Sequence, residues 1–306
     1  MNSGGGLERR LGTGFAALGF VTWLLLIFGS TVRVNGAGLS CPDWPLCFGQ
    51  LVPQLNMIIF LEWGHRLLAG TISLGFVALG GVILSRPELR RRFALQLGIM
   101  VLVLAAQIVF GGLTVLLSLA FWSVTIHLLL GNAFMALMLV MAVRLRAPGA
   151  APGAAVSAEA PAPGTIRLLA VAMVVAVALQ LGLGGLVSSN YAGLACIEWP
   201  SCNAGVWFPT FSGILGLQLF HRLGAYTVAA VAFAFVGVAR ADRAGKGAWA
   251  IVALVLVQIA LGVLNVWVRM PVELAVAHAA TAHALVATTT LVATGVLRRG
   301  RAAAAS

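Results

Sequence analysis

Residues 29–47 read GSTVRVNGAGLSCPDWPLC, and residues 184–202 read GGLVSSNYAGLACIEWPSC. At a constant offset of 155, ten of the 19 positions are identical, and both cysteines of each stretch are among them. Self-similarity of this kind is typical of a chain that contains two copies of one structural unit. The match therefore predicts a duplicated fold, and the sequence around each copy indicates what the unit is.

The similarity continues downstream of these two stretches. HRLLAGT at 65–71 resembles HRLGAYT at 221–227. Three further positions return at an offset of 151: Gln107 with Gln258, Gly111 with Gly262, and His127 with His278. The repeat thus extends over most of both halves of the chain.

The composition identifies the environment of this duplicated unit. Of the 306 residues, 61% are hydrophobic and only 9% are charged, and the mean hydropathy is +1.03. Soluble domains carry about 25% charged residues, which they need to cover their surface. The net charge of +11 lies on no polar domain with a basic stripe, so a nucleic-acid-binding protein is excluded as well. The chain is therefore predicted to be an integral membrane protein.

Long apolar runs predict eight membrane-spanning helices, because about 20 apolar residues cross a bilayer and the runs lack the alternation of barrel strands. The predicted spans are 11–32, 57–84, 93–117, 121–143, 166–188, 212–239, 248–268 and 272–297. The first run is longer than the apolar part of a signal peptide, so we expect it to remain as a helix.

An Ala- and Pro-rich segment, 147–165, separates the helices into two groups of four. We interpret it as a cytoplasmic linker between an N-terminal half, 1–146, and a C-terminal half, 166–306. Because four is an even number, both halves cross the membrane in the same direction, and an axis along the membrane normal relates them. The predicted fold is thus an all-α integral membrane protein with two tandem four-helix bundles related by pseudo-two-fold symmetry.

The positive charges orient these bundles in the membrane. Fifteen of the 19 Lys and Arg residues lie on the side of the two termini. Positive residues mark the cytoplasmic side. Both termini are therefore predicted to be cytoplasmic, and the cysteine-containing segments 33–56 and 189–211 are predicted to lie outside.

All five histidines fall inside predicted spans, where an ionisable residue is a functional candidate by default. Four of them form repeat-related pairs: His65 with His221, and His127 with His278. Each lies six to nine residues from the outer start of its helix, roughly 9–14 Å deep at 1.5 Å per residue. Imidazole is a standard axial ligand of heme, and a four-helix bundle accommodates such a macrocycle. The pattern favours two heme sites over four histidines that only hydrogen-bond between helices.

Three other residues accompany these histidines. His283 follows His278 by five residues, about 140° around the helix, so we interpret it as structural. Arg66 and Arg222 each follow a histidine directly. Their guanidinium groups suit the carboxylates of heme propionates, and snorkelling to the outer headgroups is the alternative.

Glu62 breaks the symmetry of the two halves. It precedes His65 by three residues on the same helix face, whereas Gln218 occupies the corresponding place before His221. Similar scaffolds with different chemistry indicate one reactive site and one supporting site. A carboxylate there could exchange protons or stabilise a cation, and a structural ion pair with a nearby arginine is the alternative.

The four cysteines form two C-x5-C pairs in the segments predicted to lie outside: Cys41 with Cys47, and Cys196 with Cys202. Disulfides persist outside the cytoplasm. No histidine accompanies the cysteines, which argues against zinc. Each pair is interpreted either as a structural staple over a heme site or as a redox-active pair.

Taken together, these motifs resemble heme A synthase. The resemblance rests on N-x-A-G-L-x-C-x2-W-P-x-C in both halves, E-x2-H-R on the second helix, H-R on the sixth, and the histidines His127 and His278 on the fourth and eighth. It covers nearly the whole chain apart from the linker and the tails. The form with a cysteine pair in each half is the bacterial one, which implies a bacterial cell membrane.

The resemblance implies an oxidoreductase that converts the C8 methyl of heme O to a formyl group, giving heme A. It implies that His65 and His127 hold the substrate, that His221 and His278 hold a heme b cofactor, and that Glu62 is the catalytic acid. Heme O synthase and a terminal oxidase would be the candidate protein partners. The oligomeric state does not follow from the sequence.

Two other functions fit the residues without the resemblance. A di-heme electron-transfer protein could pass electrons from quinol to a periplasmic acceptor, and a heme transporter could use both halves as one path. An acid at only one of the two sites argues against a pure relay.

Overall fold

The computed structural model describes residues 3–147 and 162–302, which form eight long α-helices and one short 3-10 helix. The helices are α1 (Ser3–Val34), α2 (Met57–Leu84), α3 (Pro87–Leu116), α4 (Phe121–Arg146), α5 (Gly164–Ser189), η1 (Ala192–Leu194), α6 (Gly213–Ala239), α7 (Gly245–Trp267) and α8 (Val272–Ala302). These residues contain no strand. Most of the predicted linker, 148–161, lies outside the described residues.

All eight long helices are long and apolar enough to cross a membrane, which confirms the eight predicted spans. Several helices extend past the predicted limits. α3 begins at Pro87, six residues before the predicted start of the span at residue 93. Proline suits the first turn of a helix. The three arginines that follow it are charged and therefore lie outside the apolar run. α4 likewise continues to Arg146. Such charged turns reach beyond the hydrocarbon, so hydropathy alone does not detect them.

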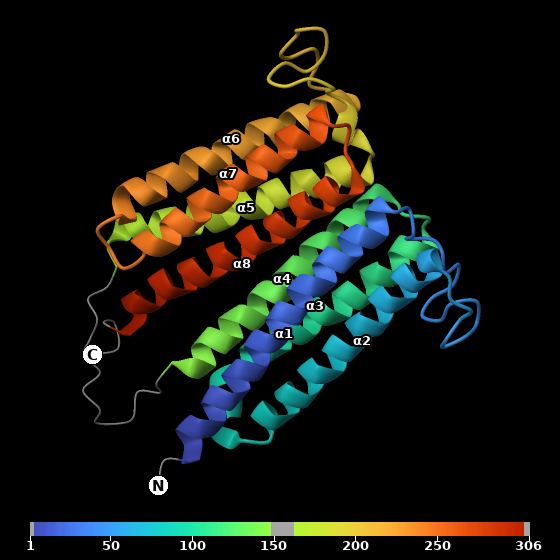
Figure 1. The fold of residues 1–306 in the computed structure, drawn as a ribbon. Helices are drawn as coiled ribbons and strands as arrows, with labels where there is room; N and C mark the ends of the chain where they lie inside the picture. The colour runs from blue at the N-terminus through green and yellow to red at the C-terminus, as the bar shows by residue number, and fades with distance from the viewer. Residues whose placement is uncertain (1–2, 148–161, 303–306) are drawn as a thin grey trace.

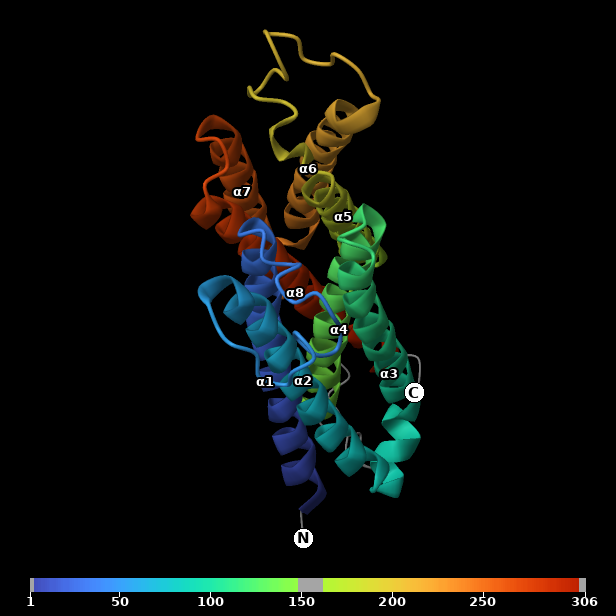
Figure 2. The ribbon, with the colours of Figure 1, turned by 90° about the vertical axis from the view of Figure 1, so that its right-hand side faces the viewer.

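The helices form two bundles with equivalent packing. In the N-terminal half α1 packs against α2 and α4, and α3 packs against α4; in the C-terminal half α5 packs against α6 and α8, and α7 against α8. The halves meet through α4 and α8, with α1 also against α8 and α5 also against α4 (Figures 1 and 2). This arrangement is consistent with the pseudo-two-fold relation predicted from the repeat.

The hydrophobic core of each bundle occupies the end near the termini. In the N-terminal half it includes Phe15, Phe76 and Phe93, and in the C-terminal half it includes Met173 and Phe235. Burial of such side chains stabilises a helix pair by close packing, since lipid is as apolar as they are. The opposite end of each bundle carries the histidines and the disulfide loops, and the candidate site lies there.

The two long loops, 35–56 and 190–212, lie at the same end of the molecule, away from both termini (Figure 1). The lateral surface of the helices is apolar, with Leu74 73% exposed and Leu95 80% exposed. Such a surface suits contact with lipid. The chain is therefore a multi-pass membrane protein.

Candidate functional site

A disulfide closes the loop of each half. The Sγ atoms of Cys41 and Cys47 are 2.02 Å apart, and those of Cys196 and Cys202 are 2.05 Å apart. The pairing is within each half, as the sequence predicts. All four cysteines are buried, with exposed fractions of 0–1%.

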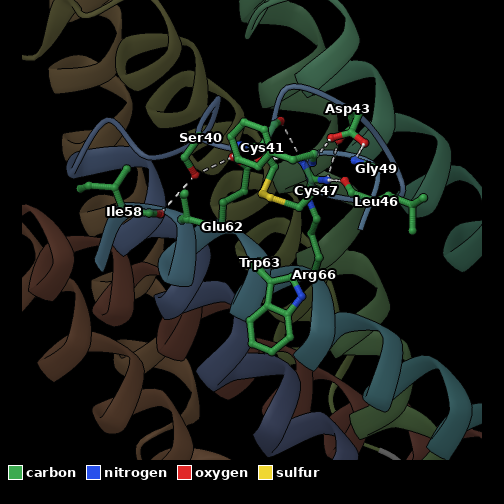
Figure 3. The surroundings of a disulfide bond; sticks show 12 residues. Ser40, Cys41, Asp43, Leu46, Cys47, Gly49, Ile58, Glu62, Trp63 and Arg66 are labelled. Atoms are coloured by element: carbon green, nitrogen blue, oxygen red, sulfur yellow. Dashed lines mark hydrogen bonds and ion pairs between the residues drawn. A yellow bond between two sulfur atoms is a disulfide. The ribbon is translucent and has the colours of Figure 1, made fainter. Parts of the chain in front are cut away.

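One acidic residue holds each disulfide loop in its shape. The carboxylate of Asp43 accepts the backbone N–H groups of Phe48 and Gly49, both at 2.7 Å (Figure 3). Phe48 and Gly49 have positive φ angles of 55° and 69°, so this turn needs external support at Phe48. The hydrogen bond from Gly49 is the main cause that lowers the pKa of Asp43. Asp43 is thus held as a carboxylate.

Glu198 does the same in the second loop. It accepts hydrogen bonds from the backbone of Ala204 and Gly205, at 3.2 and 3.0 Å, and from the hydroxyl of Ser201 at 2.8 Å. The bond from Gly205 is the main cause that lowers the pKa of Glu198. The two loops therefore share one construction.

Glu62 lies on α2 and points into the disulfide loop (Figure 3). Its carboxylate is 4% exposed and accepts the backbone N–H of Cys41 at 2.8 Å. The hydroxyl of Ser40 lies 3.0 Å from the same oxygen, and the other oxygen forms an ion pair with Arg66. The Ser40 hydroxyl also lies 3.1 Å from the carbonyl of Ile58, so its single proton is shared between the two acceptors. Ser40, Cys41 and Arg66 thus form an anion site that holds the Glu62 carboxylate beside the disulfide.

The arginines that follow His65 and His221 bind the loops. Arg66 donates to the carbonyls of Asp43 at 2.7 Å and Leu46 at 2.6 Å. Arg222 donates to the carbonyls of Ser201 at 2.9 Å and Glu198 at 2.8 Å. Each guanidinium therefore fastens a loop to its helix. Contact of Arg66 and Arg222 with heme propionates stays a prediction beside this structural role.

The second loop lacks the anion site. Gln218 replaces Glu62, and its amide donates to the carbonyl of Gly193 at 3.0 Å. Ala195 stands at the position that corresponds to Ser40. The acid and one of its donors are thus absent together from the C-terminal half. The repeat predicts Glu62 as a site residue. Ser40 is an additional site residue, and the alignment of the two repeats, GLSC against GLAC, contains its signal.

Each of the four repeat-related histidines lies against a glycine of a neighbouring helix. The pairs are Gly29 on α1 with His65, Gly111 on α3 with His127, Gly184 on α5 with His221, and Gly262 on α7 with His278. A Cβ atom at these glycines would lie 2.9, 2.9, 3.1 and 3.3 Å, respectively, from the ring Cε1 atom. At Gly29 and Gly111 a Cβ atom would force the imidazole to shift, and at Gly184 and Gly262 the ring would have to give by a few tenths of an ångström.

Each half carries one of these histidines on its second helix, His65 on α2 or His221 on α6, and the other on its fourth, His127 on α4 or His278 on α8. Three glutamine amides, those of Gln107, Gln180 and Gln258, are 3.1–3.4 Å from a ring nitrogen of His127, His221 and His278, respectively. The use of these histidines as two ligand pairs stays a prediction.

Several buried polar atoms of these histidines and glutamines have no hydrogen-bond partner within the described part of the chain. They include the ring Nδ1 atoms of His65 and His278 and the side-chain oxygens of Gln107, Gln180 and Gln258. Buried groups without partners in a native fold call for an explanation, such as a ligand. Each half has two imidazoles, and each imidazole packs against a glycine, which we call its glycine seat. Two imidazoles in an apolar bundle suit a planar, axially ligated macrocycle. The residues present therefore fit a heme in each half.

His283 points elsewhere. It is 1% exposed on α8, and its Nδ1 atom lies 3.0 Å from the side-chain oxygen of Asn132 on α4. This contact joins the two halves of the molecule. It agrees with the interpretation of His283 as a structural residue.

The fold and the site together define a class: a multi-pass helical membrane protein in two halves, each with two histidines inside its helices and a disulfide-closed loop. The chain belongs to the cytochrome oxidase assembly protein family, whose model matches residues 15–290. It is 28% identical over 299 residues to a heme A synthase from Shewanella oneidensis, covering 84% of this chain and 88% of the relative. It is 29% identical over 328 residues to a heme A synthase from Caulobacter vibrioides, covering 91% and 93% of the two chains.

Proposed function

We propose that this protein is a heme A synthase, an oxidoreductase that converts the C8 methyl of heme O to the formyl group of heme A. The observation that carries the proposal is the asymmetry of two otherwise equivalent sites. The family and its relatives support the same activity. Two histidine pairs provide two heme sites, and a buried acid adjoins only one of them.

The N-terminal half is the proposed substrate site, with His65 and His127 as the residues that hold heme O. Glu62 lies on the same helix as His65, one turn toward the loop. Where electrons leave the methyl carbon ahead of its protons, positive charge develops on that carbon. A carboxylate already held in place by Ser40, Cys41 and Arg66 needs little reorganisation to stabilise that charge.

The C-terminal half is the proposed cofactor site, with His221 and His278 as ligands of heme b. When bound, heme b supplies one-electron redox chemistry. Gly184 and Gly262 seat the two rings, and the amides of Gln180 and Gln258 lie beside them. A neutral Gln218 in place of an acid suits a site that carries electrons and leaves the chemistry of the ring substituents unchanged.

We further propose that both termini are cytoplasmic and that the disulfide loops lie outside a bacterial cell membrane. The excess of Lys and Arg at the terminal side supports this orientation. Disulfides in both loops agree with an oxidising compartment.

Pigment analysis tests the proposed function against an electron relay. Protein purified from cells that make heme O is extracted, and its hemes are separated by chromatography. We expect heme B together with heme O or heme A. Heme B alone would favour an electron-transfer protein without a heme substrate and would contradict the proposal.

A further inference from the structure

His283 and Asn132 occupy equivalent positions of the two repeats. Asn132 follows His127 by five residues on α4, and His283 follows His278 by five residues on α8. The offset between them is 151, the same as between the two histidines that precede them. The contact between α4 and α8 therefore joins a residue of the first repeat to the residue at the equivalent position of the second repeat.

The hydrogen bond between these residues has a defined direction. The amide nitrogen of Asn132 donates to the carbonyl of Leu128 at 2.9 Å, which leaves the amide oxygen facing His283. An oxygen only accepts, so Nδ1 of His283 carries the proton and donates it. Nε2 is then bare, and it has no partner within the described residues.

Both side chains are deeply buried, Asn132 at 2% and His283 at 1% exposed. Apolar side chains would fill this contact without leaving an unpaired nitrogen. A polar pair between helices is best attested as a device that fixes register. Hydrogen bonds across helices act in the same way inside membranes.

The position of this pair relates the register of α4 and α8 to the two proposed heme sites. α4 carries one histidine of the N-terminal site and α8 carries one histidine of the C-terminal site. The pair lies about 7.5 Å along each helix from those histidines, at 1.5 Å per residue. Other side-chain bonds between the halves include those of Trp23 with the carbonyl of Ala280, Thr125 with Ser189, Arg33 with Tyr191 and Arg298 with the carbonyl of Val143. Among the bonds of the described residues, the one between His283 and Asn132 joins a buried side chain of α8 to a buried side chain of α4.

We infer that the hydrogen bond between His283 and Asn132 is a positioning link that fixes the placement of the two heme sites relative to each other. Neither residue touches the reacting groups. They act through α4 and α8. Loss of the bond lets the bundles shift against one another and weakens cooperation between the two sites.

Distances between spin labels test this inference on the full chain. Val109 on α3 and Val257 on α7 are exposed and lie in different halves, so both are changed to cysteine and labelled. The four native cysteines are in disulfides and do not compete for the label. A second pair, Leu74 on α2 with Val109, reports on one half only and serves as a control.

His283→Ala and Asn132→Ala should each broaden or shift the distance distribution between the halves and leave the distribution within one half unchanged. The swapped variant, Asn132→His with His283→Asn, rebuilds the bond in the opposite direction and should restore a narrow distribution. Thr281→Ala removes a hydrogen bond within α8 only, to the carbonyl of Ala277, and should have no effect.

Heme A yield is a second readout. It rests on the proposed function, whereas the distances between spin labels do not. The alanine variants should keep the b-type spectrum and lose heme A yield by about threefold to thirtyfold, and the swapped variant should regain most of it. Unchanged distances in both alanine variants would overturn the inference. So would a swapped variant with a broad distribution, a measurement that stands even if the alanine variants do not fold.

Discussion

The carboxylate of Glu62 accepts the backbone N–H of Cys41 at 2.8 Å, so the acid of α2 is bound directly to a disulfide residue. Ser40 and Arg66 complete the anion site around it. The loop and the proposed reactive acid are thus one structural unit. Any change in the loop is expected to move Glu62, which makes the loop part of the site as well as its cover.

Glu62→Gln should remove most of the activity and leave the fold intact. The substitution keeps the length of the side chain and reproduces the residue of the C-terminal half, Gln218. Loss of one preorganised charged group costs roughly 3–4 kcal/mol of transition-state stabilisation, or about 10²–10³ in turnover. Chromatography of hemes from cells supplied with heme O should show heme O or an alcohol intermediate, with the b-type spectrum unchanged. Normal heme A yields would make Glu62 structural.

Ser40→Ala should weaken the same site to a smaller degree. It removes one donor near the Glu62 carboxylate and keeps Cys41 and Arg66. A hydrogen bond to a charged group contributes about 1.5–3 kcal/mol, so we expect a loss of roughly tenfold to a hundredfold in heme A formation. Ala195→Ser makes the converse change in the other half and is the matched control. Equal effects of both variants would contradict a specific role for Ser40.

His221→Ala and His278→Ala should each abolish the low-spin b-type spectrum, because a six-coordinate iron needs both imidazoles. His283→Ala should keep this spectrum, since its ring faces Asn132. Absorption spectra of the three purified variants decide the matter. A normal low-spin spectrum for either His221→Ala or His278→Ala would refute the assignment of the cofactor site.

Gly184→Ala should disturb the C-terminal site without touching a ligand. The added Cβ would lie 3.1 Å from Cε1 of His221, and overpacking of this kind costs typically 1–3 kcal/mol. We expect a shifted or partly lost b-type spectrum. Gly70→Ala, on a glycine with open space around it, is the control and should behave as wild type. If Gly184→Ala and Gly70→Ala have the same spectrum, the glycine beside His221 does not position this imidazole for heme binding.

The fold was largely predictable because each helix is a long apolar run, and the repeat assigned the helices to two bundles. The turn of arginines at the start of α3 was not predictable from hydropathy, because those residues lie beyond the hydrocarbon. The four histidines and Glu62 were visible as ionisable residues in spans. The glycine seats were not, because a glycine has no meaning until the neighbouring helix is placed against it. Ser40 differs from Ala195 in the repeat, but its contact with Glu62 becomes evident only when the loop is placed on α2.

His283 shows a further limit of the sequence. Its angular offset from His278 indicates a structural residue, but its partner on α4 lies 151 positions away and only the packing of the two halves reveals it. Likewise, the guanidinium groups of Arg66 and Arg222 suit carboxylates. The structure gives both of them loop carbonyls, and it gives Arg66 the carboxylate of Glu62 as well. Donor chemistry alone does not choose between such acceptors.

The central claim is the conversion of heme O to heme A, and the most direct measurement is made in a bacterial host that produces heme O and has no heme A of its own. Total hemes are extracted with and without expression of this protein, separated by chromatography and identified by mass. We predict that heme A appears only with the protein, and that it disappears again in the Glu62→Gln variant. Abundant, b-type-loaded protein in membranes that contain heme O but no heme A would contradict the account.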